Sequence, residues 1–301
     1  MSLLDRLTSL LRPSARRPGL SLEIRPDGIA WASGSSLGFA ECTPAKRLPA
    51  LQDIVSSQRL GGAQTTMVLP LDQYQVFQLE RPEGVDDAEL GDALKWKLKD
   101  FLEFNPSEAV SDVFPFPEDA ARGRGDLVNV VAVRRTLIAD LVALANAADL
   151  ELQRIDIAEL ALRRLASRLD DTGRGAALVH LRDRYGHMVI CKGDTLYLSR
   201  RLDVASDELR EVSSQENAVQ SLALEMQRSL DYYESQLGQV PPPVINLVAR
   251  DTMLPLTSML GSYLAASART LDWAALGLEQ APDSRCLVAW SAGLSLQGDG
   301  P

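Results

Sequence analysis

The stretch Leu22–Gly28 (LEIRPDG) and its counterpart Leu178–Asp183 (LVHLRD) decide the fold that we expect for this chain. Each belongs to a strand-turn-strand pattern, and one such pattern opens each half of the sequence. Turns of this kind cradle phosphate when glycine lets backbone N–H groups approach the oxygens closely. Arg25 and Arg182 occupy these turns, where a larger residue spoils the close approach. The layout predicts a nucleotide-binding fold, whereas the residues indicate that the nucleotide chemistry has been lost.

Strand and helix signals continue through the first half. We expect strands over 20–24, 29–32, 37–40, 65–69 and 74–79, and a helix over 48–60. A helix follows with Asp86 as its N-cap and Glu89 reaching back, and then a strand over 126–133, a helix over 135–148 and a strand over 152–157. These later segments predict a small α/β subdomain inserted into the first lobe at about 80–157.

The second half repeats the opening pattern after a predicted boundary at Asp170–Gly173. We expect strands over 176–181, 188–191, 195–198, 244–248 and 286–290, with helices over 216–237 and 253–266. The sequence therefore predicts a duplicated α/β chain, with a first lobe over 19–172, a second lobe over 173–301 and a leader over 1–18.

The composition disfavours several classes of protein. The chain has 301 residues, of which 46% are hydrophobic and 24% charged, as in ordinary globular proteins. A net charge of −10 and a pI near 4.8 disfavour binding to nucleic acid. No apolar run approaches the roughly 18 residues of a membrane-spanning helix. Asp5, Arg6 and Arg12 interrupt the N-terminal segment, so it does not resemble a secretory signal.

The cysteines indicate the compartment. Cys42, Cys191 and Cys286 lie far apart, are odd in number and have no metal-ligand spacing. Buried, reduced thiols are typical of cytoplasmic proteins. The sequence therefore predicts a cytoplasmic location.

The leader carries leucines at helical spacing, followed by basic residues. Two interpretations stay open: peripheral attachment to an anionic membrane surface, or a frayed terminal segment. The residues concerned are Leu3, Leu4, Leu7, Leu10, Leu11, Arg12, Arg16 and Arg17.

Several segments resemble the PilM-like family of pilus-assembly proteins, and within it the MshI-type proteins of mannose-sensitive haemagglutinin (MSHA) pili. The stretch Asp92–Pro106 (DALKWKLKDFLEFNP) is similar to the corresponding helix of that family. Asp112–Phe114, Leu196–Leu202 and Leu224–Leu237 also fit the MshI pattern, and Gly293–Leu296 resembles the family's Gly-Leu-Ala-Leu ending. The resemblance extends over almost the whole chain after the leader.

This resemblance implies a fold and a function. The fold would be the two-lobed actin-like fold of PilM, FtsA and the cytoplasmic domain of GspL, with a small subdomain inserted in the first lobe. The function would be that of a non-enzymatic scaffold of a type IV pilus platform, at the cytoplasmic face of the inner membrane. Such a protein docks the short cytoplasmic tail of a PilN-like bitopic membrane protein between the first lobe and its subdomain. A pilus assembly ATPase is a second implied partner.

The chain departs from the family at the phosphate segments. Where PilM has Asp-Ile-Gly followed by Ser or Thr, this chain has Glu23, Ile24, Arg25 and Pro26. Pro26 also removes a backbone N–H donor.

The second Asp-Ile-Gly segment becomes His180, Leu181 and Arg182, and histidine is a poor ligand for Mg²⁺. Ala249–Asp251 replaces an expected Gly-Gly pair. We therefore expect no cofactor and no catalysis. The alternative is an ATP-binding protein or weak ATPase that uses Mg²⁺ and a site rebuilt with Arg25 and Arg182.

Two further patterns favour structural interpretations. Gly34–Gly38 fits the G-x-S-x-G motif around Ser36, but that motif needs a strand-to-helix turn and here joins two predicted strands. A loop is therefore favoured over a hydrolase. His180 and His187 could face each other across a strand pair, but without a third nearby ligand they indicate sheet residues and no metal site.

Three aromatic residues remain candidates for partner contact. Trp96 lies off the apolar stripe of its predicted helix, and Phe101 and Phe104 follow it. Packing beneath the inserted strands is one interpretation. The other is that these side chains line the groove for the partner's tail.

Overall fold

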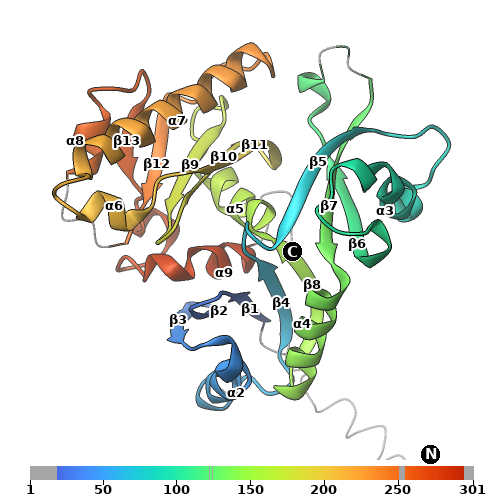
Figure 1. Cartoon of the computed structure of the whole chain (residues 1–301). Coiled ribbons are helices and arrows are strands. Elements are labelled where there is room, and N and C mark those ends of the chain that lie inside the picture. The colour runs from blue at the N-terminus through green and yellow to red at the C-terminus, as the bar shows by residue number, and fades with distance from the viewer. Residues whose placement is uncertain (1–18, 122, 124, 251–254, 295–301) are drawn as a thin grey trace, which may run out of the picture.

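Two five-stranded sheets with the same strand order form the framework of the molecule (Figure 1). The first has the order β3-β2-β1-β4-β8, and the second has the order β11-β10-β9-β12-β13. In each sheet the earliest strand lies in the middle, paired antiparallel with the next strand and parallel with a later one. The duplication predicted from the two strand-turn-strand patterns is therefore present.

The bounds of these strands follow the predicted segments closely in most cases. The first sheet contains β1 (Gly19–Ile24), β2 (Gly28–Ser33), β3 (Ser36–Glu41), β4 (Gln64–Leu69) and β8 (Glu151–Ile157). The second contains β9 (Ala176–Leu181), β10 (Gly186–Lys192), β11 (Thr195–Leu202), β12 (Val244–Val248) and β13 (Ser267–Thr270).

This computed structural model describes residues 19–121, 123, 125–250 and 255–294. The leader over 1–18, Asp251, the first residues of the helix predicted over 253–266 and the end of the Gly293–Leu296 segment lie outside the described residues. Among the residues that are described, no helix has the length and apolar character needed to cross a membrane.

Helices cover the outer face of each sheet. On the first lobe, α2 (Arg47–Ser57) and α4 (Arg135–Ala147) pack their apolar residues against the sheet. On the second lobe, α7 (Gln215–Ser235) and α8 (Leu256–Leu260) do the same, and the short α6 (Ser206–Arg210) lies beside α7. Burial of these amphipathic faces is the main stabilising contribution to each lobe.

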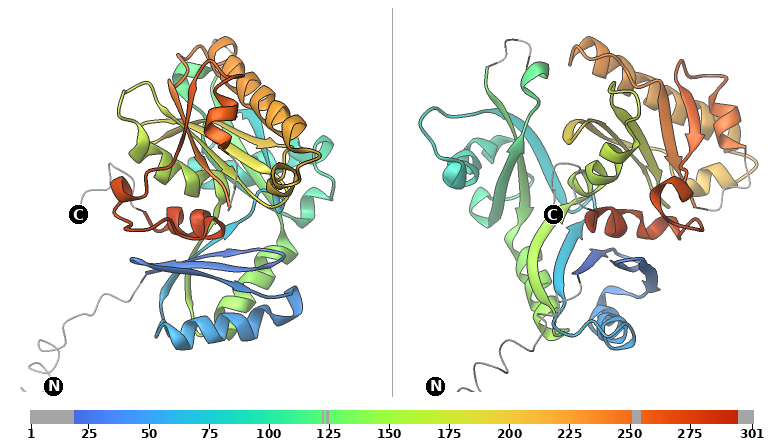
Figure 2. Two further views of the ribbon diagram at one scale, coloured as in Figure 1. Left: turned by 90° about the vertical axis from the view of Figure 1, so that its left-hand side faces the viewer. Right: turned by 180° about the vertical axis from the view of Figure 1, so that it is seen from behind.

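Two helices lie between the sheets and join the lobes. Figure 2 shows α9 (Leu287–Ala292) between the first-lobe sheet and the second lobe, and α5 (Ala158–Ala166) packs beside it. Their shared core takes side chains from both sheets, including Val68 of β4 and Val189 of β10. All six residues of α9 are buried.

The burial of α9 explains why the strand predicted over 286–290 was wrong. We expected a strand over 286–290, but the segment forms a short 3-10 turn and then α9. A short run of apolar residues cannot be assigned to a strand or a buried helix by periodicity alone. Burial against both lobes favours the helix, and this burial depends on the tertiary structure.

A third sheet belongs to a separate subdomain. It has the order β5-β7-β6, with β5 (Tyr74–Glu80), β6 (Ala109–Pro115) and β7 (Leu127–Arg134). Helix α3 (Asp87–Lys95) covers its outer face, where Leu90, Leu94 and Leu98 pack on alternate residues of β7. The inner face of the sheet is turned toward the two lobes (Figure 1).

The subdomain differs from the prediction at several points. Strand β8, predicted as part of the insertion, belongs to the first-lobe sheet, because it pairs with β4. Strand β6 was not predicted at all. Helix α3 begins after Asp86, as expected, but the Asp86 side chain makes no capping hydrogen bond. The helical path becomes a 3-10 helix over Trp96–Asp100 well before Asn105.

The second lobe departs from the prediction at a further place. Of the described residues of the helix predicted over 253–266, only five are helical, as α8, and an unpredicted edge strand, β13, follows. Ser262–Ala266 leads into β13, which continues the parallel side of the sheet beside β12. Pairing with β12 is a long-range contact, so local propensity does not reveal it.

The loop between β6 and β7 fastens the subdomain to the second lobe. Phe116 and Ala120 are buried in the core of the second lobe. Asp119 accepts hydrogen bonds from the Tyr197 hydroxyl, at 2.8 and 3.0 Å, and from Gln239 Nε2, at 3.0 Å. The subdomain therefore contacts both lobes.

Candidate functional site

The two strand-turn-strand turns meet where the lobes face each other, and each sends an arginine to the other. Arg182 Nη1 donates a hydrogen bond to Glu23 Oε1 at 2.6 Å. Arg25 Nη2 donates to Asp183 Oδ2 at 3.1 Å. The two turns have the same backbone closure, since Arg25 N–H bonds the carbonyl of Gly28 and Arg182 N–H bonds that of Tyr185. The lobes are thus joined by a reciprocal pair of ionic contacts.

The Arg182–Glu23 pair is deeply buried. The Glu23 side chain is 0% exposed and that of Arg182 is 6% exposed. Burial by itself lowers the pKa of the Arg182 guanidinium, but the charge of Glu23 and its hydrogen bond outweigh burial, so the pKa lies above its usual value. The guanidinium is therefore charged, and removal of Glu23 leaves it without its counter-ion in the interior.

Two carboxylates balance the positive charge of Arg25. Its guanidinium binds both carboxylate oxygens of Asp27, at 2.9 and 3.0 Å, and also reaches Asp183. Burial raises the pKa of Asp27, but the hydrogen bond and charge of Arg25 outweigh it, so the pKa lies below its usual value. Each of the two arginines predicted at the phosphate turns thus has its counter-ion within the protein.

A cavity of about 510 Å³ lies beside these turns, and Pro26 is part of its wall. Its lining holds as many arginines as aspartates, so the wall offers a triphosphate no excess of positive charge. These residues are Arg25, Arg182, Arg184, Arg201, Asp27, Asp72, Asp183 and Asp207.

The two histidines are sheet residues. His180 of β9 lies opposite His187 of β10 in the strand register, as the sequence suggested. Burial, followed by the nearby charge of Arg182, lowers the pKa of both, that of His187 to about 3. His187 Nε2 lies 2.9 Å from Ser199 Oγ. Within the part of the chain that the structure describes, no group of three residues could hold a metal ion.

Ser36 lies in a hairpin. It is exposed at the start of β3 and opposite Ser33 of β2, so its turn joins two strands. The strand-to-helix geometry of a hydrolase nucleophile is therefore missing at this position.

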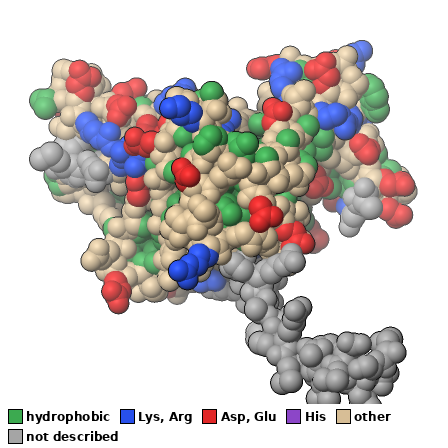
Figure 3. Space-filling view, turned by 90° about the horizontal axis from the view of Figure 1, so that it is seen from below, with side chains coloured by type: hydrophobic (Ala, Val, Ile, Leu, Met, Phe, Trp, Pro, Cys, Tyr) green, Lys and Arg blue, Asp and Glu red, His purple; other side chains and the backbone are tan. Residues whose placement is uncertain are grey.

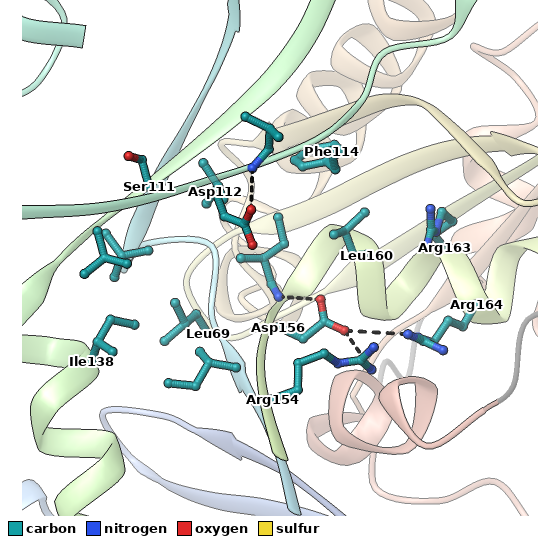
Figure 4. Close-up of a pocket in the computed structure, with 16 residues that line it drawn as sticks. Leu69, Ser111, Asp112, Phe114, Ile138, Arg154, Asp156, Leu160, Arg163 and Arg164 are labelled. Carbon is teal, nitrogen blue, oxygen red and sulfur yellow. Dashed lines mark hydrogen bonds and ion pairs between the residues drawn. The ribbon is translucent and has the colours of Figure 1, made fainter. Parts of the chain in front are cut away.

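A groove between the first lobe and the subdomain is the second candidate site (Figure 4). It has a volume of about 440 Å³ and lies where β6 and β7 face the ends of β4 and β8 and the start of α5. Most of its wall is apolar. The apolar lining residues are Leu69, Val110, Val113, Phe114, Val131, Val133, Ile138, Ile155, Ile157 and Leu160.

The polar residues of the groove are mostly paired with each other. Asp156 accepts from the N–H of Ile157 at 2.9 Å and forms ion pairs with Arg154, at 3.2 Å, and Arg164, at 3.9 Å (Figure 4). Arg163 differs, since its Nε is buried and has no hydrogen-bond partner among the described residues. No carboxylate of those residues lies within 4.0 Å of its guanidinium nitrogens.

The three aromatic candidates for partner contact lie elsewhere on the subdomain. Trp96 is 64% exposed and Phe101 is 56% exposed. Phe101 contacts the ring of Phe77 at 5.8 Å, and Phe104 lies under the guanidinium of Arg134 at 4.2 Å. None of the three lines the groove.

Sequence reasoning missed most of the groove, because its residues come from strands that were unpredicted or misplaced. The one usable signal was the segment Asp112–Phe114, which fits the MshI pattern and lines the groove as part of β6. On the face shown in Figure 3, acidic and basic side chains are interspersed.

Comparison with known proteins defines the fold. No family model and no curated protein matches the sequence. Among solved structures, the PilM–PilN type IV pilus biogenesis complex matches with a TM-score of 0.66 and 19% identity, covering 95% of this chain and 100% of that one.

Two further structures match over most of their length. The cytoplasmic domain of EpsL, an inner-membrane component of the type II secretion system of Vibrio cholerae, matches with a TM-score of 0.55 and 13% identity, covering 91% of this chain and 94% of that one. A Bacteroides thetaiotaomicron protein of unknown function matches with a TM-score of 0.52 and 10% identity, covering 87% and 96%. The latter is described as having an actin-like ATPase fold, and this chain has that two-lobed actin-like fold.

Proposed function

We propose that this protein is a non-enzymatic, MshI-like scaffold of a type IV pilus assembly platform, located at the cytoplasmic face of the inner membrane. It docks the short cytoplasmic tail of a PilN-like bitopic membrane protein in the groove between β6 and β8. The observation that carries the proposal is this apolar groove, in a chain whose overall structure is similar to that of a PilM–PilN complex. A pilus assembly ATPase is a further proposed partner.

The groove suits a peptide because its wall is largely apolar and its few polar groups are mostly bonded within the protein. Ligand sites of this kind gain affinity from buried apolar contact and specificity from a few fixed polar groups. Val131 and Ile155 come from the two facing sides of the groove, β7 and β8. A short apolar tail would therefore be buried on two sides.

The test is a titration with the labelled N-terminal tail of the bitopic membrane protein encoded beside this chain. We expect micromolar binding by fluorescence anisotropy. Val131→Lys places a charge in the groove and should weaken binding at least about tenfold, because an unpaired ammonium is costly in an apolar site. The matched control, Val142→Lys, lies on the exposed side of α4 and should leave affinity unchanged. Failure to bind at several hundred micromolar would contradict the proposal.

The alternative function is nucleotide binding or weak ATP hydrolysis with Mg²⁺. It would require Arg25 and Arg182 to leave Asp183 and Glu23, to which they are bonded. We propose that no nucleotide binds. Calorimetry with ATP and Mg²⁺ tests this directly, and micromolar affinity that is lost in Arg25→Ala would favour the alternative.

A further inference from the structure

We infer that the partner's tail binds as an additional strand on the free edge of β8 and extends the first-lobe sheet. This inference rests on the proposed function and adds how the tail is held. Among the residues that the structure describes, strand β8 lies at the end of the sheet and pairs on one side only, with β4. Seven residues long, it presents the kind of unpaired edge that recognises extended peptides in other proteins.

The direction of the backbone groups shows which residues face the groove. The N–H of Ile157 donates to the carboxylate of its neighbour Asp156, so it does not donate to β4. Successive backbone groups of a strand point to opposite sides. The N–H and carbonyl of Ile155 therefore point away from β4 as well. Four consecutive residues, Arg154–Ile157, line the groove, as expected when it runs along the strand edge.

The facing strand, β6, also lies at the end of its sheet, but α3 packs against it at Ser111. Ser111 Oγ donates to the carbonyl of Gly91 in α3 at 2.9 Å. A Cβ atom at Gly91 would lie 2.7 Å from the Ser111 carbonyl oxygen, so helix and strand are in close contact there. We therefore assign the tail to β8.

The groove also indicates the chemistry of the tail. Side chains on one face of an added strand would contact apolar residues such as Leu69 and Val133. Arg154 and Arg164 are paired with Asp156, whereas Arg163 has no acidic partner among the described residues. A buried N–H donor without a partner is costly, and a carboxylate from outside would accept a hydrogen bond from the Arg163 Nε. The partner is thus an extended apolar segment that carries an acidic residue.

Amide hydrogen exchange measured by NMR tests the strand directly. The probe is the same synthetic N-terminal tail, added to the full chain at saturation. We expect exchange of the Ile155 amide to slow at least about tenfold, because a new hydrogen bond protects it. Amides of β13, the corresponding edge strand of the second lobe, serve as the control and should not change.

A second measurement uses tail peptides that are N-methylated at one residue at a time. Methylation removes one backbone donor, so an added strand predicts that alternate positions lose affinity by about threefold to tenfold while those between them do not. A docked helix predicts no alternation.

The role of Arg163 is tested by a double-mutant cycle with the acidic residue of the tail changed to its amide. Arg163→Gln should weaken wild-type tail binding about tenfold and leave binding of the amide tail unchanged. Arg228→Gln, an exposed site on α7, is the matched control.

The outcomes separate the two proposals. A tail that binds and protects the Ile155 amide supports both. A tail that binds without this protection, or without an alternating methylation pattern, overturns the added strand and leaves the scaffold function standing. Absence of coupling between Arg163 and the acidic residue of the tail overturns the inference that this residue pairs with Arg163. A tail that does not bind at all overturns the proposed function and the strand with it.

Discussion

The junction between the two turns and the groove beside β8 differ in how their polar groups are satisfied. At the junction, Arg25 and Arg182 are each bonded to a carboxylate of the opposite lobe. In the groove, the Nε of Arg163 is buried without a hydrogen-bond partner, and the outer edge of β8 has no partner strand, among the described residues. A site whose charges are paired internally gains little from a ligand, whereas unpaired groups favour one. This difference supports our proposal that the chain binds a partner in the groove and no nucleotide at the junction.

The two lobes show the same difference at their sheet edges. Strand β13 ends the second-lobe sheet with only four residues, three of them exposed. Strand β8 ends the first-lobe sheet with seven residues and has an apolar groove along part of its edge. Short edge strands are one way in which proteins prevent unwanted pairing. The first-lobe sheet ends in the longer strand, and we expect binding of the partner's tail to be the reason.

The largest predicted effect concerns the closed junction. Glu23→Gln should lower the free energy of unfolding by about 3–5 kcal/mol, because it leaves the Arg182 guanidinium buried without its counter-ion. Urea denaturation measures this. The exposed pair of Arg201 and Asp203 supplies the control, since Asp203→Asn should change stability by less than about 0.5 kcal/mol.

A second variant sharpens this comparison. Adding Arg182→Met to Glu23→Gln removes the buried, unpaired charge. The double variant should regain part of the lost stability, because apolar replacements of buried ion pairs are often tolerated. A single variant as stable as the wild-type chain would show that the junction does not depend on these charges.

The next effect concerns the contact that holds the subdomain beside the groove. Phe116→Ala should cost about 3 kcal/mol, since the ring is buried in the second-lobe core. Hydrogen exchange of β5, β6 and β7 should rise more than that of β9, because the variant releases the subdomain. Equal increases in all four strands would mean that Phe116 stabilises only the second lobe.

A pH-dependent effect concerns Glu159, which is buried in α5 and accepts a hydrogen bond from the Tyr74 hydroxyl. Burial raises the pKa of Glu159 from 4.5 to about 7. The folded state therefore holds a proton that the unfolded state releases between about pH 4.5 and 7, so stability falls as the pH rises through this range.

Glu159→Gln removes this dependence. Between pH 5 and pH 8 the wild-type chain should lose on the order of 2 kcal/mol relative to the variant. Chemical denaturation at several pH values measures the difference. Comparison with the variant is needed because His180 and His187, whose pKa values are lowered by burial, act in the opposite direction below pH 6.5. If the difference in free energy of unfolding between the two chains did not change with pH, Glu159 would keep its charge in the folded protein.

The smallest predicted effect concerns the exposed aromatic residues. Trp96→Ala and Phe101→Ala should change tail affinity by less than about twofold, because residues outside the desolvated centre of an interface contribute little. Anisotropy titrations of both variants measure this. A loss comparable to that of Val131→Lys would move the binding site from the groove to the outer face of the subdomain.

Much of the framework could be predicted because it is local. The β1–β2 and β9–β10 hairpins follow from alternating apolar residues around short turns, and these signals are contained within about ten residues of sequence. The long helix α7 follows from apolar residues spaced by three and four. The duplicated α/β class rests on the repetition of these local patterns, whereas the actin-like fold was implied by the resemblance to PilM-like proteins.

Contacts between residues far apart in the sequence could not be predicted. Arg25 lies 158 residues from Asp183, and Arg182 lies 159 residues from Glu23, so no local pattern shows that the arginines pair with acids of the opposite turn. The assignment of β8 to the first sheet, and its open edge, likewise depend on pairing with β4, which is more than 80 residues away.

The sequence by itself determined that two similar halves exist and that arginine replaces glycine at both turns, because residue identity and short-range periodicity suffice for these conclusions. Only the tertiary structure decided what the arginines bind, which strand edge is left open and whether residues 287–292 form a strand or a helix. The physical reason is that charge pairing, edge exposure and burial on two sides depend on elements brought together by folding, and a single segment carries no record of its distant neighbours.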